Sequence, residues 1–314
     1  MITKHEKKRR IVGASAFIDD IHHNKWLLAM SIPGFIMVFL FRYLPMGGMV
    51  MAFQNYSLYL GISGSKWVGF RNFVRFFSDP FFPRLLGNTF LLGLFDILWS
   101  FPAPILLALM LNEVTIKRFK KVTQTITYLP YFISVVIIVG IMRSIFGNEN
   151  GVINDGIHAL GGNVIAFFNE TKWFRPLYIG SGIWQNVGYN SILYLAAITG
   201  IDSQLYEAAK IDGASKMACM FKITLPCMIP TIAVLFTLRI GSVLSVGFEK
   251  ILLMYSPATY SVADVISTYV YRMGMLNQEF GYAAAVGLFN SVVAVMFLLL
   301  GNWTSRHLFG ESLW

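Results

Sequence analysis

Hydrophobic residues occur in six long runs along the chain, separated by shorter polar stretches. The runs cover approximately residues 26–45, 87–111, 122–146, 177–199, 226–247 and 281–301. A helix rises about 1.5 Å per residue, so about 20 residues cross the ~30 Å apolar core of a bilayer. Because the backbone inside lipid must satisfy its own hydrogen bonds, each run is expected to be helical. The pattern predicts an all-α integral membrane protein with six transmembrane helices.

The sequence predicts one membrane domain between two polar terminal segments. We expect a basic N-terminal segment over residues 1–25, a six-helix domain over 26–301 and a tail over 302–314. The basic stretch Met1–Arg10 also resembles the start of a secretory signal. However, the polar part before the apolar core is longer than usual, and no small-residue cleavage pattern follows it. The first run is therefore interpreted as an uncleaved helix.

Composition supports the membrane interpretation. The chain is 56% hydrophobic and 13% charged, and its mean hydropathy is +0.60, whereas soluble domains carry about 25% charged residues. Buried helices of a large soluble core would need amphipathic neighbours to cover them. The sequence offers no such neighbours, which argues against a soluble protein.

The basic residues predict the orientation. If the N-terminus is cytoplasmic, the inner segments hold 14 of the 25 lysines and arginines, and the longer outer segments hold eight. Inner segments richer in positive charge agree with the positive-inside rule. The inner segments are 1–25, 112–121, 200–225 and 302–314, and the outer ones are 46–86, 147–176 and 248–280. The net charge of +9 thus indicates topology and contact with anionic membrane lipid. Because the charge is spread over separate turns, it does not indicate nucleic-acid binding.

The outer segment 46–86 is aromatic and predicts a short helix of its own. Its apolar residues fall at i, i+3, i+4 and i+7, a spacing typical of a helix lying in the membrane interface. These residues are Phe70, Phe73, Val74 and Phe77, and Asp79-Pro80 follows them as a stop signal.

The loop between the fourth and fifth runs, residues 203–225, is too long for a simple turn and must contain structure. Ser203 can cap a short helix starting near Gln204, with Glu207 close to the positive end of its dipole. Asp212-Gly213 is a turn signal, because glycine allows positive φ. Alanines keep one side of the loop thin, and Pro226 suits the first turn of the next helix. A rigid knob able to dock on another protein is predicted.

The same loop carries a family resemblance. Its residues Glu207, Ala208, Ala209, Asp212, Gly213, Ile223, Leu225 and Pro226 resemble the cytoplasmic "EAA" loop signature of permease subunits in ATP-binding-cassette (ABC) importers. Tyr206–Ala214 is similar to the carbohydrate-uptake branch, and Arg42–Tyr56 resembles permeases for oligosaccharides or polysaccharide fragments. Together with the order of the six helices, the resemblance covers essentially all of residues 26–310.

The resemblance implies both fold and partners. The fold would be that of a type I importer permease, and the loop would be the coupling helix seated in a cleft of a separate ATPase. The expected partners are a second similar permease, two copies of the ATPase and an extracytoplasmic solute-binding protein. The expected substrate is a glycan, and the expected location is the cytoplasmic membrane of a prokaryote, with both termini in the cytoplasm.

The sequence lacks the motifs that an enzyme or an ATP-binding subunit would need. It contains no Gly-x-x-x-x-Gly-Lys-Ser/Thr phosphate loop, so ATP is expected to bind a partner. The five histidines have no ligand or nucleophile spacing, and Cys219 and Cys227, eight residues apart, have no metal-ligand spacing. We therefore expect no catalytic residue, no cofactor and no metal site.

Polar side chains at one depth of four predicted helices form the candidate substrate path. Counting from the ends of the runs puts them ~12–14 Å below the outer surface. They are Asp96, Gln185, Asn186, Arg239 and Asn290, with Trp184, Tyr189, Asn190 and Tyr194 nearby. Such a layer could bind sugar hydroxyls, or it could join helices, with Asp96 and Arg239 as a structural ion pair. We favour the cavity for the fourth and fifth helices and packing for Asn290.

Three rival functions stay open at this stage. An importer for another solute, such as a peptide or a polyol, would differ only in its cavity residues. An ion-coupled secondary transporter would need carboxylates at the midplane, and Asp96 is the only embedded one. A membrane enzyme would need a catalytic constellation that the sequence lacks.

Overall fold

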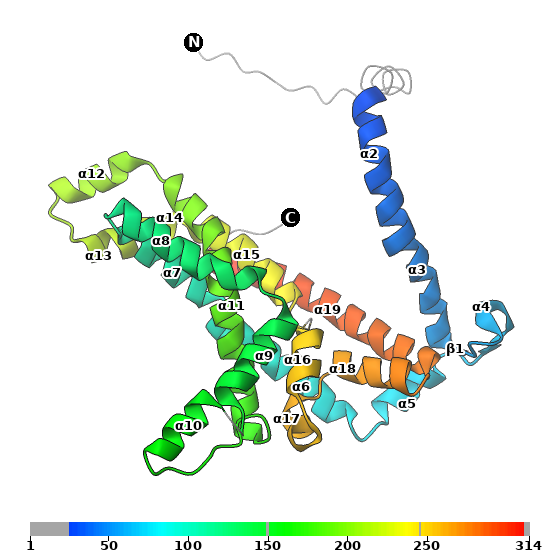
Figure 1. Cartoon of the computed structure of the whole chain (residues 1–314). Coiled ribbons are helices and arrows are strands. Elements are labelled where there is room, and N and C mark those ends of the chain that lie inside the picture. The colour runs from blue at the N-terminus through cyan, green and yellow to red at the C-terminus, as the bar shows by residue number, and fades with distance from the viewer. Residues whose placement is uncertain (1–24, 149–150, 245, 311–314) are drawn as a thin grey trace.

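The computed structural model describes residues 25–148, 151–244 and 246–310, and these are mostly helical (Figure 1). The predicted basic segment over residues 1–25 therefore lies outside the described residues, apart from Lys25. The helices are α2 (Lys25–Val38), α3 (Leu44–Met46), α4 (Gly61–Gly64), α5 (Arg71–Phe77), α6 (Phe82–Phe95), α7 (Pro102–Glu113), α8 (Lys117–Tyr128), α9 (Val135–Phe146), α10 (Val152–Ala159), α11 (Thr171–Thr199), α12 (Ser203–Ile211), α13 (Lys216–Cys219), α14 (Leu225–Cys227), α15 (Ile229–Gly241), α16 (Phe248–Met254), α17 (Tyr260–Ala263), α18 (Ile266–Tyr271) and α19 (Phe280–Phe309). Strands β1 (Gln54–Asn55) and β2 (Lys66–Trp67) form one antiparallel pair.

Within these described ranges, three helical stretches are long and apolar enough to cross a membrane. They are Lys25–Phe53, Phe82–Glu113 and Phe280–His307. Two bent pairs raise the number to five if each pair is one span. The expected count of six is not confirmed, because α11 fails on hydropathy although it has 29 residues. Polar residues such as Gln185, Asn186 and Asn190 lower its mean.

The third predicted helix, 122–146, is not continuous. The chain bends by 104° between the helical segments Lys117–Phe132 and Val135–Phe146. Pro130 lies at the break and cannot donate a backbone hydrogen bond, and Ser134 caps α9 by accepting from the Ile137 N–H. The run predicted as one helix is thus two helical segments, because a local stop signal and a local start signal fall within one apolar run; the two can still form one bent span.

Other boundaries also differ from the predicted ones. The fifth run ends as a helix at Gly241 instead of residue 247, and α19 continues to Phe309, into the segment predicted as a tail. In the second run, Asp96–Ser100 wind as a π-helical turn directly before Pro102. Prolines lack the donor that an uninterrupted α-helix needs, so a break in the α-helical pattern is expected there.

Helix α11 lies at the centre of the packing. One apolar cluster joins it to α9, α16 and α17 through Tyr178, Met142 and Ile251, and a second joins it to α7 and α15 through Tyr194 and Ala108. The backbones approach closely at Gly188, where a Cβ would lie only 2.0 Å from the Thr127 carbonyl oxygen of α8. Small residues at such crossings are typical of membrane helix packing.

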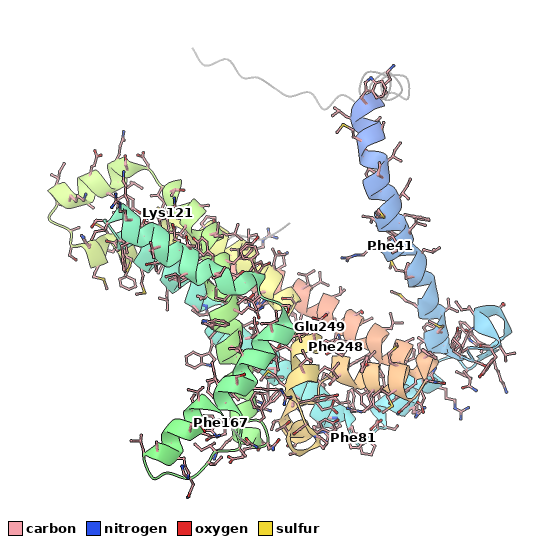
Figure 2. The ribbon with its side chains drawn as sticks, viewed as in Figure 1. Phe41, Phe81, Lys121, Phe167, Phe248 and Glu249 are labelled. Atoms are coloured by element: carbon pink, nitrogen blue, oxygen red, sulfur yellow. The ribbon has the colours of Figure 1, made fainter. Side chains whose placement is uncertain are left out.

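Most of the first apolar stretch, residues 25–46, stands apart from the bundle (blue in Figure 1), whereas its end, Gly47–Phe53, packs on α19. None of its span-length window is buried against the rest of the chain. The stretch is apolar on all sides, and Phe41 projects from it without a neighbouring helix (Figure 2). A helix of this kind is stable only where lipid or another membrane subunit covers it.

The short outer helix predicted from the aromatic spacing exists as α5, Arg71–Phe77. Its buried residue is Phe76, whereas Phe70, Val74 and Phe77 are more than half exposed. Phe76 packs against Leu85, Tyr269 and Tyr282 in a third apolar cluster. The helix therefore contacts the bundle through Phe76, and most of the apolar side chains that were predicted to share one face are exposed.

Candidate functional site

The loop between α11 and α15 contains two short helices, α12 and α13, as its length predicts. The cap of α12 is Asp202, whose carboxylate accepts a hydrogen bond from the Gln204 N–H at 2.9 Å. The prediction that Ser203 is the cap was therefore wrong by one residue, because Ser203 is already helical. Glu207 consequently lies in the second turn of α12 and not near its first.

Gly213 ends α12 in a left-handed conformation, with φ of +75°. The Ala214 N–H donates to the Ala209 carbonyl at 2.9 Å, and the Gly213 N–H donates to the Lys210 carbonyl at 3.1 Å. These two bonds form a Schellman cap, which favours glycine because it tolerates positive φ. Asp212 is the last residue before this turn. The bend between the two short helices is thus fixed by the backbone.

The second half of the loop returns to the bundle. Ser215 caps α13 by accepting from the Ala218 N–H at 3.2 Å. The Tyr206 hydroxyl and the Thr224 hydroxyl are hydrogen-bonded at 2.9 Å, which ties α12 to the segment that enters the membrane domain. Ile223 and Leu225 flank buried Thr224, and Leu225 packs on the cluster of α7, α11 and α15. Pro226 lies in α14, near the end of the helical segment Lys216–Cys227, and the next helix, α15, begins only at Ile229 after a bend of 60°. The prediction that Pro226 starts the next span was therefore wrong.

The tip of this loop is an exposed mixed surface. Glu207 and Ala208 are exposed and Ala209 is half-buried. Large apolar side chains beside them are also exposed, namely Leu205, Ile211, Met217 and Phe221. Figure 1 shows α12 and α13 at one extreme end of the molecule, near the start of α8. A rigid exposed surface with apolar side chains and a free carboxylate suits docking to another protein.

The polar candidates of the membrane domain meet at a cavity of about 550 Å³. Asp96, Gln185, Asn186 and Arg239 all line it, together with residues of α9 and α16. Arg239 of α15 forms an ion pair with Asp96 of the π-helical turn. The two interpretations, a substrate cavity and a contact that joins helices, are therefore compatible, since the ion pair joins two helices and also lines the cavity.

A second cavity of about 220 Å³ adjoins the first. Asn190 and Tyr194 of α11 line it, and Arg239 and Ser242 line both cavities. Arg239 thus stands between the two spaces. The Gln185 amide donates to the Ile133 carbonyl at 3.3 Å, and the Asn186 amide donates to the Gly182 carbonyl at 2.8 Å, so both side chains keep their carbonyl oxygens available.

Three predicted path residues lie elsewhere. Trp184 lines a separate apolar cavity beside Ile138 and Met142. The Tyr189 ring stacks on the Tyr131 ring with centroids 3.8 Å apart. Asn290 of α19 lines none of these cavities, and its buried side-chain oxygen accepts no hydrogen bond from the residues that the structure describes.

Sequence reasoning missed the contribution of α16 to the cavity wall. Phe248, Glu249 and Lys250 line the cavity, although the sequence places them in an outer loop. Figure 2 shows Phe248 and Glu249 close to the centre of the bundle. Lys250 is 7% exposed, and its ammonium donates to the Tyr178 carbonyl at 3.1 Å. A charged pair directly before the apolar run Ile251–Met254 is the sequence signal that could have indicated this.

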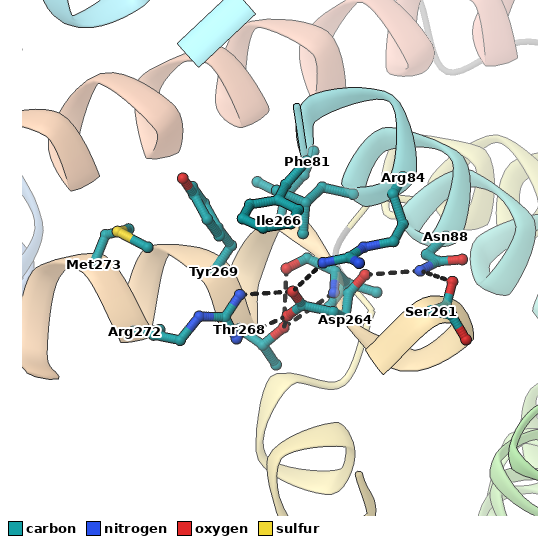
Figure 3. Close-up of polar contacts among 12 residues, drawn as sticks. Phe81, Arg84, Asn88, Ser261, Asp264, Ile266, Thr268, Tyr269, Arg272 and Met273 are labelled. Atoms are coloured by element: carbon teal, nitrogen blue, oxygen red, sulfur yellow. Dashed lines mark hydrogen bonds and ion pairs between the residues drawn. The ribbon is translucent and has the colours of Figure 1, made fainter. Parts of the chain in front are cut away.

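A buried ion network joins α6 to the segment that contains α17 and α18 (Figure 3). Asp264 has no exposed side-chain surface and pairs with Arg272 at 2.6 Å and with Arg84 at 3.7 Å. The Asn88 amide donates to the backbone carbonyls of Ser261 and Asp264, both at 3.0 Å. The network connects α6 to α17 and α18, so it fixes the segment around Asp264 against α6.

A second outer carboxylate, Asp79, is held by tyrosines. Burial alone would raise the pKa of Asp79. Hydrogen bonds from the Tyr269 hydroxyl, the Phe81 N–H and the Tyr282 hydroxyl outweigh burial and lower that pKa below its ordinary value. Asp79 therefore joins α5 and α6 to α18 and α19 in its charged form.

Comparison with known proteins identifies relatives over nearly the whole chain. The chain is 44% identical to the polygalacturonan/rhamnogalacturonan transport system permease protein YteP of Bacillus subtilis (strain 168), covering 99% of this chain and 95% of YteP. It is also 44% identical to protein LplB of the same organism, covering 93% of this chain and 92% of LplB.

A solved structure is similar at the level of the fold. It is the crystal structure of a bacterial ABC transporter involved in the import of the acidic polysaccharide alginate. The matched chain has a TM-score of 0.85 and 44% sequence identity, covering 93% of this chain and 99% of that chain. A second crystal structure shows the alginate transporter in complex with an alginate pentasaccharide-bound periplasmic protein, again with a TM-score of 0.85 and 44% identity over 94% of this chain and 99% of that one.

The family comparison agrees with these relatives. The model of the binding-protein-dependent transport system inner membrane component matches residues 81–309, which include the 203–225 loop and both cavities. The match begins just before α6 and ends with α19, so it spans all the helices that pack around α11. The chain therefore belongs to this family, the multi-pass inner-membrane permease subunits of binding-protein-dependent ABC importers.

Proposed function

We propose that this permease passes oligosaccharide fragments of polysaccharides across the cytoplasmic membrane. The observation that carries the proposal is the cavity of about 550 Å³, lined by Gln185, Asn186 and Arg239. Hydroxyl-rich substrates need hydrogen-bonding side chains that are held in place within an enclosed space. The similarity in sequence to a polygalacturonan/rhamnogalacturonan permease, and in sequence and fold to an alginate importer, supports glycans as the substrate class.

The energy for transport comes from partner subunits. The 203–225 loop is proposed to dock in a cleft of an ABC ATPase, with Glu207 pairing a basic group there and the exposed apolar residues around it filling the cleft. ATP binds the two ATPase copies and not this chain. A second permease and an extracytoplasmic solute-binding protein complete the importer, and the alginate transporter crystallised with its periplasmic protein supports that arrangement.

The proposed topology has six spans, with α11 as the fourth. A span that lines a cavity can be less apolar than one that faces lipid, which accounts for the polar residues of α11. Residues 1–25 and 302–314 and the 203–225 loop face the cytoplasm, and 26–301 form the membrane domain. Figure 2 supports this orientation, because Lys121 lies at the end of the molecule that carries α12, and Phe81 and Phe167 lie at the other.

Reconstitution tests the proposal directly. The full complex with its binding protein is placed in proteoliposomes, and uptake of labelled trigalacturonate is measured with and without enclosed ATP. We expect uptake only with ATP and only with the binding protein. Uptake that follows a proton or sodium gradient without ATP would instead support a secondary transporter. Uptake of a peptide or a polyol in place of any glycan would support an importer for another solute.

A further inference from the structure

Lys250 is a buried cation without an acidic partner. Its side chain is 7% exposed, and its ammonium donates to the Tyr178 carbonyl at 3.1 Å and lies 5.2 Å from the centroid of the Tyr178 ring. Among the described residues, no carboxylate forms an ion pair with it. Removing an ammonium from water without a counter-charge is costly, so such a group usually has a functional reason.

The ammonium lies at the wall of the large cavity. Gly182 of α11, which also lines this cavity, is so close that a Cβ there would lie 3.6 Å from the Lys250 Nζ. The absence of a side chain at residue 182 leaves room beside the charge. Gln185 and Asn186, about one turn further along α11, line the same space and can bind neighbouring hydroxyl groups.

The other charged groups of the cavity form no ion pair with Lys250 among the described residues. Burial lowers the pKa of Lys250 to about 8, and Asp96 raises that pKa electrostatically, but the ion pair of Asp96 is with Arg239. Glu249 is exposed, so water weakens the effect of its charge without abolishing it, and it forms no ion pair within residues 25–148, 151–244 and 246–310. A buried positive charge thus remains at the cavity wall, and it would complement an anionic ligand.

We propose that Lys250 binds the carboxylate of an acidic sugar unit in this cavity and makes the subunit selective for uronate-containing oligosaccharides. An ammonium has three N–H donors, of which one is used on the Tyr178 carbonyl. The remaining two can donate to carboxylate oxygens, and such charge-assisted hydrogen bonds are the strong kind. This inference rests on the proposed function, since it assumes that the cavity carries a glycan.

A pair of matched ligands isolates the carboxylate. Trigalacturonate and its methyl ester share one sugar backbone but differ in charge. Binding of each is measured on the assembled permease–ATPase complex in detergent without the solute-binding protein, for the wild type, Lys250→Gln, Lys250→Arg and Lys172→Gln. Lys172 is a suitable control because it lies at the outer start of α11, is exposed and does not line the cavity.

We expect Lys250→Gln to weaken trigalacturonate binding roughly tenfold or more and to leave methyl ester binding unchanged. Lys250→Arg should retain most of the preference for the acid, and Lys172→Gln should behave like the wild type. Glu249→Gln offers a second test that does not disturb a buried group. Removing this negative charge from the cavity should strengthen binding of the acid and not of the ester.

Two results would contradict the role of Lys250. Equal losses for both ligands in Lys250→Gln would show that Lys250 only attaches α16 to α11. An unchanged ratio of acid to ester binding in both Lys250→Gln and Glu249→Gln would show that the cavity does not detect the charge. A wild-type complex that neither binds nor transports either ligand would contradict the proposed function itself, and the inference with it.

Discussion

The first prediction concerns the backbone angle φ of Gly213. A Cβ there would meet no atom within 4 Å, so the φ of +75° is the only obstacle to another residue. Proline is restricted to φ near −65°, whereas asparagine tolerates the left-handed region. Gly213→Pro should therefore insert into the membrane normally but uncouple ATP hydrolysis and abolish uptake. Gly213→Asn should keep most uptake, and equal uptake by both variants would exclude a coupling role for this turn.

The second prediction concerns the negative charge of Glu207 in the same loop. It is exposed, so Glu207→Lys should not affect folding, but it should repel the basic group expected on the ATPase. We expect uptake to fall roughly tenfold or more with normal membrane insertion, because the partner charge is left unpaired. Glu113→Lys, also exposed and on the cytoplasmic side of α7 in the proposed topology, is the control. Normal transport by Glu207→Lys would contradict the docking role.

The third prediction concerns the contribution of Asp79 to the stability of the protein at different pH. Its pKa is lower in the folded protein than the ordinary value of 3.8, so its ionised form contributes stability above that value. The contribution is lost as the pH falls through the lowered pKa. The melting temperature of the purified complex, measured from about pH 6 to about pH 3, should fall more steeply for the wild type than for Asp79→Asn. Parallel curves would show that Asp79 does not contribute in its charged form.

At the scale of elements, apolar run length predicts where helices lie but not where they break. The second and sixth runs form long continuous helical stretches, whereas the third breaks at Pro130 and Ser134 despite its uniform hydrophobicity. In the loop, Gly213 could be placed from sequence because its role is local, whereas Pro226 was wrongly assigned to the start of the next span. The cavity role of Lys250 could not, because it depends on α16 folding back onto α11, which is a tertiary contact.

The order of elements across the membrane leads to a labelling prediction. After Cys219 and Cys227 are replaced by serine, single cysteines are introduced at Ser63, Asn163 and Ser215, all of which are exposed. An impermeant thiol reagent added to intact cells should label positions 63 and 163 but not 215, since α12 and α13 are proposed to face the cytoplasm. Disrupted cells serve as the control for position 215. Labelling of that position from outside would reverse the topology.

At the scale of the whole molecule, residues far apart in sequence line one cavity. Asn186 and Asn290 are therefore expected to have different roles, because only Asn186 is among these residues. Asn186 lines the cavity, whereas Asn290 lies on α19 away from it, with a buried oxygen. Asn186→Ala should change the relative uptake of different oligosaccharides while the complex stays assembled. Asn290→Ala should change the melting temperature and leave that preference unaltered. The reverse pattern would indicate that the α11 residues serve only to join helices.

The glycine contacts between α15 and α19 affect how a movement spreads through the protein. A Cβ at Gly241 would lie 2.5 Å from the Leu298 side chain, and one at Gly301 would lie 2.8 Å from the Ile240 side chain. Two helices interlocked this closely cannot slide past each other without first separating, so they are expected to swing as one lever. The 203–225 loop is joined to α15 through α14 and a bend of 60°, and the N-terminal part of α19 packs on α5 and α18. In the proposed topology, a displacement at the cytoplasmic end would therefore reach the outer side of the protein along α15 and α19, and it would move Arg239 in the cavity wall with α15.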